Sequence, residues 1–507
     1  MRTYTLLARN LAWYWRTNLA VLLGVATATG VLGGAALVGE SVRATLRTLV
    51  LDRLGNTDSI VTRNGFFRQE LASALRPAAP LIALDGVVED QASGRRAAGV
   101  QVFGVEERFW SFQGLPGSPP RGFEARLSAA LARELGATPG GEILLRVPKP
   151  SAIPLESLHG RKEDGGKTLR LTVSRSAAPP RDFSLRPQQG QVRAVYVPLA
   201  RLQRDLDRPA QVNTILVSGP PPARRLRQSY TLADAGLHLR PLENPAGLSL
   251  ESDSALIADP VAQAALAAAQ SLGLRAQPLL TYLANAIRIG DRQIPYSLVT
   301  ALDSPLAPAA DDGIALNDWA ARELGAKPGD QATLEYYVWR SDSRLRTETA
   351  RFRVERIVPL AGGADDPLLA PEYPGITGSR SLRDWDPPFP LDMTRIRPAD
   401  EQYWNRYRTA PKAFIRLAPG RLIWGTRFGS LTSVRIFPPR AAFAEALRTA
   451  LDPAQAGLAI VPVRAEGLKA AQGATDFGEY FVYFSFFLVV SALLLTGLFF
   501  YVWMLVV

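Results

Sequence analysis

The feature that most constrains this chain is its C-terminal end, where the run from Tyr480 to Val507 contains no charged side chain. A helix rises about 1.5 Å per residue, so roughly 20 apolar residues are enough to cross a hydrocarbon core about 30 Å thick. A second uncharged run, 17–39, lies near the N-terminus between Arg16 and Glu40. The two runs predict transmembrane helices at 17–39 and 480–507, with the residues between them on one side of the membrane.

The first sixteen residues, 1–16, predict a helix that lies on the membrane surface. Arg2, Arg9 and Arg16 share one stripe of such a helix, and aromatic residues precede the first apolar run. A cleaved signal peptide is the alternative. The apolar run is longer than is usual in a signal peptide and a good cleavage site does not follow it, so we expect an anchor that is retained.

Small residues mark one side of the first predicted span. Ala26, Gly30 and Gly34 recur every four residues and so lie on one face of a helix. Small side chains allow another helix to approach closely. We therefore expect this stripe to pack against a membrane-spanning partner.

The long middle of the chain, 40–463, alternates short strand-like runs with short helical patterns and predicts a mixed α/β extracytoplasmic domain. The predicted fold class is accordingly α+β, with two transmembrane helices on either side of this domain. Two loops rich in proline and charge, 148–167 and 361–390, are expected to be surface excursions.

A segment of this middle region is repeated. LSAALARELGATPGG, from Leu127, matches LNDWAARELGAKPGD, from Leu316, at an offset of 189 residues. Each copy predicts a helix capped by Ser or Asn, ended by Gly and followed by a Pro-Gly turn and a strand. We expect repeated helix-turn-strand units near 127–147 and 316–336.

The segment before the C-terminal run, 464–479, predicts a stalk between the domain and the second span. Three glycines within it, Gly467, Gly473 and Gly478, are the positions at which we expect the stalk to adjust its direction.

Composition excludes several classes of function. The net charge is +11, but Arg and Lys are spread along the chain, so we expect no nucleic-acid partner and instead contact with anionic lipid headgroups. The chain has no cysteine and only two histidines, and no nucleophile or metal-ligand pattern is present. We predict no catalytic, cofactor-binding or metal-binding residues and no enzymatic activity.

Several stretches together resemble a known family. They are LARNLAWYWRTNLAVLLGVATATGVLGGAALVGESVRATL from Leu7, VYVPLARLQRDL from Val195, TYLANAIRIGDRQIPYSLV from Thr281 and ATDFGEYFVYFSFFLVVSALLL from Ala474. In order and spacing they resemble the permease subunits of MacB/FtsX-type ABC transporters, which carry a periplasmic core domain. The resemblance implies a multi-pass protein of the cell inner membrane, a second permease chain and a separate cytoplasmic ATPase. It also implies a mechanical role, in which ATP-driven motion passes to the periplasmic domain.

The chain departs from this family after its last apolar run. Family members continue into a charged cytoplasmic segment and further spans, whereas this sequence stops at Val507. We therefore expect a truncated permease. The alternative is a membrane-anchored binding or scaffold protein without ATPase coupling, or an inactive fragment. The sequence does not indicate a substrate or a direction of transport.

Overall fold

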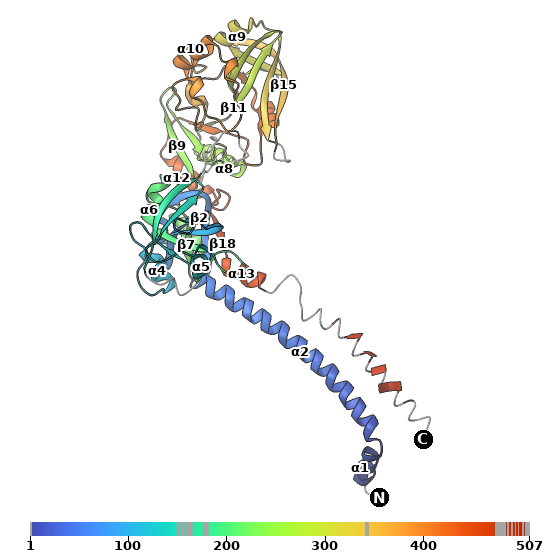
Figure 1. The fold of residues 1–507 in the computed structure, drawn as a ribbon. Coiled ribbons are helices and arrows are strands. Elements are labelled where there is room, and N and C mark those ends of the chain that lie inside the picture. The colour runs from blue at the N-terminus through green and yellow to red at the C-terminus, as the bar shows by residue number, and fades with distance from the viewer. Residues whose placement is uncertain are drawn as a thin grey trace.

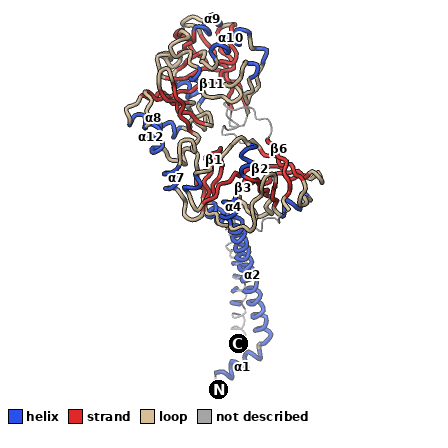
Figure 2. Tube along the Cα trace, turned by 90° about the vertical axis from the view of Figure 1, so that its left-hand side faces the viewer, coloured by secondary structure: helices blue, strands red, loops and turns tan. Residues whose placement is uncertain are grey.

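The computed structural model describes residues 3–149, 153, 158, 166–175, 182–339, 344–471 and scattered positions between 483 and 501. These residues form two lobes arranged end to end, and a long helix projects from the first lobe (Figures 1 and 2). Each lobe is built on one sheet, with nine strands in the described part of the chain.

The sheet of the first lobe closes partly on itself, because β2 pairs with β8 and β3 and also with β5. Its strands, in spatial order, are β18 (Ala459–Val461), β1 (Ser59–Arg68), β8 (Gln211–Val217), β2 (Ala78–Asp90), β3 (Arg96–Val105), β7 (Ala194–Pro198), β4 (Glu124–Leu127), β6 (Lys167–Val173) and β5 (Glu142–Val147).

The sheet of the second lobe is arranged in the same way, and here β11 pairs with β17, β12 and β14. Its strands, in spatial order, are β9 (Leu237–Leu242), β10 (Gly247–Ser252), β17 (Ser433–Phe437), β11 (Arg275–Ile289), β12 (Arg292–Leu302), β16 (Ala413–Ile415), β13 (Gly313–Asn317), β15 (Leu345–Val358) and β14 (Gln331–Trp339).

The two sheets are duplicates of one another. Strand for strand, the order matches, and so do the directions of pairing. β3 pairs with β7 in parallel as β12 pairs with β16, and β4 pairs with β6 in parallel as β13 pairs with β15. The other pairs are antiparallel in both lobes. The repeated segment seen in the sequence is thus one part of a whole-lobe repeat.

The last strand of each repeat crosses to the other lobe. In chain order the first repeat runs from β1 to β9 and the second from β10 to β18. Yet β9 pairs with β10, the first strand of the second repeat, and β18 pairs with β1, the first strand of the first repeat. The lobes therefore exchange their final strands, and they cannot separate without breaking β-sheet pairing.

Short helices connect the strands, and four in each repeat follow corresponding strands, whereas the helix after β3 and the helix before β16 have no counterpart among the described residues. In the first repeat they are α3 (Leu71–Ala74), α4 (Glu107–Gln113), α5 (Ala129–Leu135), α6 (Leu199–Asp205) and α7 (Ala223–Ser229). In the second they are α8 (Asp259–Ser271), α9 (Asp318–Leu324), α10 (Pro398–Tyr407), α11 (Leu417–Trp424) and α12 (Ala442–Ala450), with the 3-10 turns η1 (Pro367–Leu369), η2 (Leu382–Asp384) and η3 (Met393–Arg395). Outside the repeats lie α1 (Thr3–Trp13), α2 (Trp15–Leu54) and α13 (Val463–Ala470).

Local sequence explains the repeated unit. The Ser128 side chain accepts a hydrogen bond from the Leu131 N–H at the start of α5, and the Asn317 side chain accepts one from the Ala320 N–H at the start of α9. Each helix then ends at a glycine in the left-handed region, Gly136 with φ 64° and Gly325 with φ 62°.

The predicted fold class is wrong in its two transmembrane helices. Among the residues that the structure describes, no helix has the length and apolar character that a membrane crossing requires. The run 17–39 is not a separate element, because it forms the first part of the 40-residue helix α2, which continues through Glu40, Arg43 and Asp52 to Leu54. The run 480–507 lies mostly outside the described residues.

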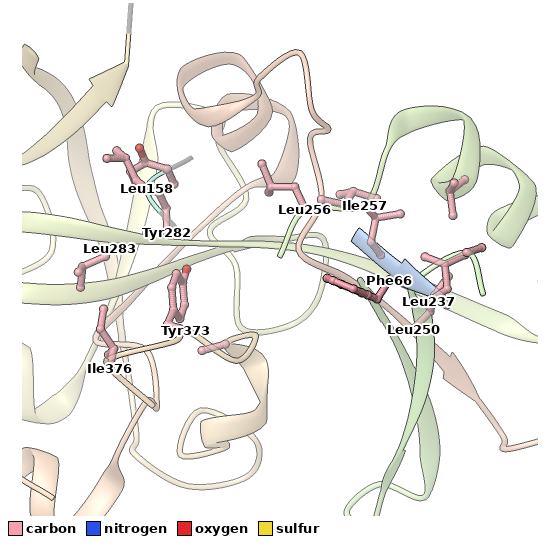
Figure 3. Packing of buried hydrophobic residues seen from close by; sticks show 14 of the residues in the cluster. Phe66, Leu158, Leu237, Leu250, Leu256, Ile257, Tyr282, Leu283, Tyr373 and Ile376 are labelled. Atoms are coloured by element: carbon pink, nitrogen blue, oxygen red, sulfur yellow. The ribbon is translucent and has the colours of Figure 1, made fainter. Parts of the chain in front are cut away.

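The expectation for the loop 361–390 is also wrong. This stretch packs onto the second lobe and buries large side chains, namely Leu369, Tyr373, Ile376, Leu382, Trp385 and Phe389. These apolar residues alternate with Pro, Gly and charged residues, so their pattern matches neither a helix nor a strand. Most of the loop 148–167 lies outside the described residues, although Leu158 lies against Tyr282 of the second lobe (Figure 3).

The cores of the two lobes are continuous. Phe66 of β1 lies beside Leu237 and Leu250 of β9 and β10, close to Leu256 and Ile257 (Figure 3). Apolar burial thus reinforces the exchanged strands at the place where the lobes meet.

Candidate functional site

Two helices from opposite ends of the sequence, α2 and α13, meet at the base of the first lobe. Helix α2 enters the lobe there, and helix α13 leaves it and packs against α2 (Figure 1). Helix α2 ends at Gly55, whose φ of 55° turns the chain into β1 and whose N–H donates to the Leu51 carbonyl. We call the residues that hold this place together the basal clasp: Val50, Arg53, Asp58, Arg464 and Gly467.

Arg53 fastens the end of α2 to a loop of the first lobe. Its side chain is buried, and its guanidinium donates to the carbonyl oxygens of Gln188 and, over 2.6 Å, of Gly190. Burial lowers the pKa of the Arg53 guanidinium, and the Asp182 carboxylate opposes that shift. The guanidinium still stays charged at neutral pH, because its ordinary pKa is so high. The carbonyl groups therefore hold a partly desolvated cation.

Arg464 connects the start of α13 to the start of β1. Its Nε atom lies 2.5 Å from the Asp58 Oδ1 atom, and its Nη2 atom donates to the Gly55 carbonyl over 2.6 Å. The Arg464 backbone N–H also donates to the Asp58 carbonyl. Asp58 in turn accepts a hydrogen bond from the Gly219 N–H, just after β8. One carboxylate thus ties three segments that are distant in the sequence.

Gly467 sets the separation of the two helices. A Cβ atom built on it would lie 2.8 Å from the Val50 Cγ1 atom, closer than side chains normally approach. The absence of a side chain therefore lets α13 lie directly on α2. Gly467 was predicted to adjust the direction of a stalk, and the structure places it in a tight helix contact. Gly473 and Gly478 lie outside the described residues.

The predicted small-residue stripe lies on the projecting part of α2. Ala26, Gly30 and Gly34 are exposed, and a Cβ atom built on either glycine would meet nothing within 4 Å. Within the described residues the structure therefore brings no other helix to this stripe, and it stays a prediction about a partner.

Beneath the basal clasp lies a cluster of aromatic rings. Phe183 packs edge-on against Phe103 and Phe109, with ring centroids 5.0 and 5.2 Å apart. Tyr196 and Trp110 complete the cluster, and Leu54 and Val463 connect it to α2 and the start of α13. The base of the lobe is a close-packed body, and such a body transmits displacement with little deformation.

A second group of residues holds the lobes together, and we call it the lobe joint: Arg63, Arg68, Tyr230, Asp234 and Gly236. The Tyr230 hydroxyl lies 2.5 Å from the Arg448 carbonyl oxygen and 3.0 Å from that of Leu451. It thereby connects the two segments that cross between lobes. Burial raises the pKa of the Tyr230 phenol, which keeps the donating proton in place at neutral pH.

Ion pairs complete the lobe joint. Asp234 is fully buried and accepts from Arg68 through both carboxylate oxygens, over 2.9 and 2.6 Å. Arg63 lies 3.5 Å from Asp253 and passes directly over Gly236, where φ is 67°. The pairs connect β1 of the first repeat to Asp234, just before β9, and to Asp253, just after β10.

The basal clasp and the lobe joint connect segments that lie far apart in the sequence. No group of three or more His, Asp or Glu side chains in the described part of the chain could hold a metal ion. Sequence reasoning missed Arg53, Asp58 and Arg464, because isolated charges beside turns look like solvated surface residues. The offset of 189 residues was the one signal that could have predicted the whole-lobe repeat.

Fourteen chains of solved structures match this chain, and two of them are described here. The periplasmic region of MacB from Actinobacillus actinomycetemcomitans matches with 13% identity and a TM-score of 0.22, over 36% of this chain and 85% of that one. The extracellular domain of the noncanonic ABC-type transporter YknZ from Gram-positive bacteria matches with 10% identity and a TM-score of 0.21, over 34% and 88%. No protein-family profile and no curated protein matches the chain. Similarity at this level does not by itself assign the chain to a family.

Proposed function

We propose that this chain is the force-transmitting component of an ABC transporter system of the MacB/FtsX type, with its two lobes outside the cytoplasm. The observation that supports the proposal is the basal clasp. It holds α2 and α13, which come from opposite ends of the chain, against each other and against the first strand of the first lobe.

The arrangement of α2 and α13 on the first lobe suits the transmission of force. Helix α2 has 40 residues, so it is a lever about 60 Å long of which only the last turns pack on the lobe. A displacement of its far end reaches the lobe through Arg53, and the close contact at Gly467 lets α2 and α13 slide along each other without separating. Because β18 pairs with β1, a movement of α13 acts on the first sheet directly.

The second lobe follows the first through the exchanged strands. Movement of β1 acts on Phe66 and Arg68, which contact the start of the second lobe through the lobe joint. A hinge made only of a flexible linker would let the lobes swing independently. Here two crossing segments and two exchanged strands move together, and the lobes are expected to turn as a coupled pair.

The proposed partners are a cytoplasmic ATPase and a second permease chain. Large apolar side chains on the projecting part of α2 support contact with another molecule, since Leu22, Leu37 and Val38 are 63%, 73% and 61% exposed. Ala26, Gly30 and Gly34 are the proposed packing positions for the second chain. A substrate is not part of the proposal.

A cysteine cross-link tests the proposal, because the natural chain has no cysteine to interfere. Val50→Cys with Gly467→Cys joins α2 to α13, where the atoms already approach closely. The variant is expressed with a candidate ABC ATPase from the same genome, and co-purification and ATPase activity are measured under oxidising and reducing conditions. The matched control is Arg146→Cys with Thr168→Cys, a directly opposed pair on the far strands of the same lobe.

We expect the oxidised cross-link to lower the ATPase activity of the complex and the reductant to restore it. The control pair is expected to show no such change. An oxidised clasp that leaves ATPase activity unchanged would reject force transmission through α2 and α13. Failure of any ATPase to associate with the natural chain would favour the alternative, a binding or scaffold protein.

A further inference from the structure

The whole-lobe repeat allows each position in one sheet to be compared with its counterpart in the other. On the outer face of the first lobe, strands β2, β5 and β6 place Glu89, Leu144 and Arg170 in one row. The matching row in the second lobe, on β11, β14 and β15, is Arg288, Thr333 and Arg351. The next rows are Glu142 with Thr172, and Gln331 with Arg353.

The charges on these matching faces differ. In the first lobe, Glu89 and Glu142 balance Arg170 and its neighbour Arg146, and Arg170 lies 3.9 Å from Glu142. A sheet with this topology can therefore fold with equal numbers of positive and negative side chains on its outer face. The fold does not require an excess of positive charge there.

The second lobe has an excess of positive charge at the same place. Arg288, Arg351 and Arg353 replace Glu89, Arg170 and Thr172 of the first lobe. Two carboxylates lie close to these arginines: Glu335 pairs with Arg288 over 2.7 Å and with Arg395 over 3.8 Å, and Glu355 accepts from the Ala309 and Ala310 N–H groups and also attracts Arg353. Among the described residues, no ion pair involves Arg351 or Arg353, and both are exposed.

We call Arg288, Gln331, Thr333, Arg351 and Arg353 the basic face. Residues two apart on a strand are about 7 Å apart, and neighbouring strands are about 4.8 Å apart. Arg351 and Arg353 thus present two guanidinium groups at the repeat distance of alternate side chains in an extended peptide. Gln331 and Thr333 add an amide and a hydroxyl beside them, at the opposed positions on β14. The hollow beside the basic face also includes Asp291 and Asp330, each close in sequence to a cation, Arg292 or Lys327.

We propose that the basic face of the second lobe binds an extended acidic segment of a partner protein. Guanidinium groups pair with carboxylates through two parallel hydrogen bonds, so two arginines at this spacing select carboxylates on alternate residues. Strand β14 pairs with one edge of β15 from Leu345 to Arg353, and β13 pairs with the other edge from Arg353 to Val358. The segment is therefore placed on the exposed face, along β15, where the side chains of Arg351 and Arg353 lie. Strand β15 belongs to the lobe that lies away from α2 (Figure 1).

The test uses the full chain and a fluorescent peptide of alternating Glu and Thr, about eight residues long, with anisotropy measured at an ionic strength of about 50 mM. Arg351→Glu with Arg353→Glu is expected to weaken binding about tenfold or more, since two attractive pairs become repulsive. The matched control, Arg146→Glu with Arg170→Glu on the first lobe, is expected to leave affinity unchanged. Raising the salt concentration is expected to weaken binding of the natural chain.

Arg351→Gln with Arg353→Gln repeats the test without charge reversal and covers the case in which the reversed variant fails to fold. Three results would overturn the proposal. One is no binding of the peptide by the natural chain, and another is equal loss of affinity in the first-lobe control. The third is binding of phosphatidylglycerol vesicles that is stronger than peptide binding and is lost in the second-lobe variants, because the partner would then be a lipid surface.

Discussion

Lys412 gives the sharpest prediction, because it is a cation in the interior of the second lobe. The side chain is 5% exposed, and its Nζ atom lies 5.0 Å from the ring centre of Trp319 and 5.1 Å from that of Tyr403. The matching position in the first lobe is Ala194, since the Ser128 N–H donates to the Ala194 carbonyl as the Asn317 N–H donates to the Lys412 carbonyl. The fold accepts a small apolar residue there.

Burial lowers the pKa of Lys412 from 10.5 to about 8. Asp400 and Glu323 favour the charged form, whereas Arg397 opposes it. A pKa difference of this size between the folded and the unfolded chain lowers the free energy of unfolding by about 3 kcal/mol while the lysine is charged. The two aromatic rings also attract the cation by about 0.5–2 kcal/mol, so the net penalty is expected to lie between about 1 and 3 kcal/mol.

The direction in which stability changes with pH follows from proton binding to the folded and the unfolded chain. Between pH 8 and pH 10.5 the unfolded chain holds the lysine proton and the folded chain does not. The contribution of Lys412 to stability therefore rises with pH across this window and is lost as pH falls through 8. Below pH 8 Lys412 is protonated in both the folded and the unfolded chain, and the loss of stability that it causes no longer changes with pH.

The experiment compares Lys412→Met with the natural chain in urea, followed by tryptophan fluorescence from pH 7 to pH 10.5. The methionine variant is expected to be more stable at pH 7 by about 1–3 kcal/mol, with the difference shrinking toward pH 10.5. Lys327→Met, at an exposed position, is the control and is expected to show no pH-dependent difference. A difference that does not change with pH, or a methionine variant that is less stable at pH 7, would refute the reasoning.

Two further predictions concern the lobe joint. Tyr230→Phe removes the hydroxyl that donates to the Arg448 and Leu451 carbonyls, and we expect a loss of about 1 kcal/mol in urea unfolding, against no change for the exposed Tyr4→Phe. Gly236→Ala adds a Cβ atom that would overlap the buried Arg63 guanidinium, at a φ of 67°. We expect a loss of about 1–3 kcal/mol and faster proteolysis between the lobes; a loss no greater than that of Gly94→Ala, which has a similar φ and open space, would contradict the packing argument.

Local patterns were enough to predict the short repeated units but not the lobes that contain them. Ser128, Gly136, Asn317 and Gly325 act within a few residues of their partners, so their roles can be inferred from the sequence. The pairing of β18 with β1 joins residues about 400 positions apart and involves three residues on the shorter strand. Nothing in so short a strand specifies its partner, and the exchange of strands could not be predicted.

The candidate site was predicted only in part, for a related reason. Gly467 was singled out for its conformational freedom, and the structure shows that its lack of a side chain serves close packing against Val50. Arg464 and Asp58 carry charges beside turns, a pattern that is typical of exposed residues. Their partners are set by the tertiary fold, so sequence spacing alone gave no signal of the basal clasp.

The uncharged runs misled the prediction of fold class. The hydropathy of 17–39 predicted a separate membrane-spanning helix. In the structure this run and the charged segment that follows it form one helix, α2. Conversely, the loop 361–390 looked polar from its Pro, Gly and charged residues, yet its scattered aromatic residues cover the second lobe. In both cases the average composition of a segment hid the placement of its individual side chains.

Force transmission through the basal clasp is best tested with the cross-linked variant, because the cross-link changes only the freedom of α2 and α13 relative to each other. The quantity to measure is the ratio of ATPase rates of the complex containing Val50→Cys and Gly467→Cys, before and after addition of reductant. We expect the reductant to raise the rate about tenfold, which corresponds to a cross-link that raises the activation free energy by about 1.4 kcal/mol. A ratio of one, with the cross-link verified and the Arg146→Cys, Thr168→Cys control behaving identically, would contradict it.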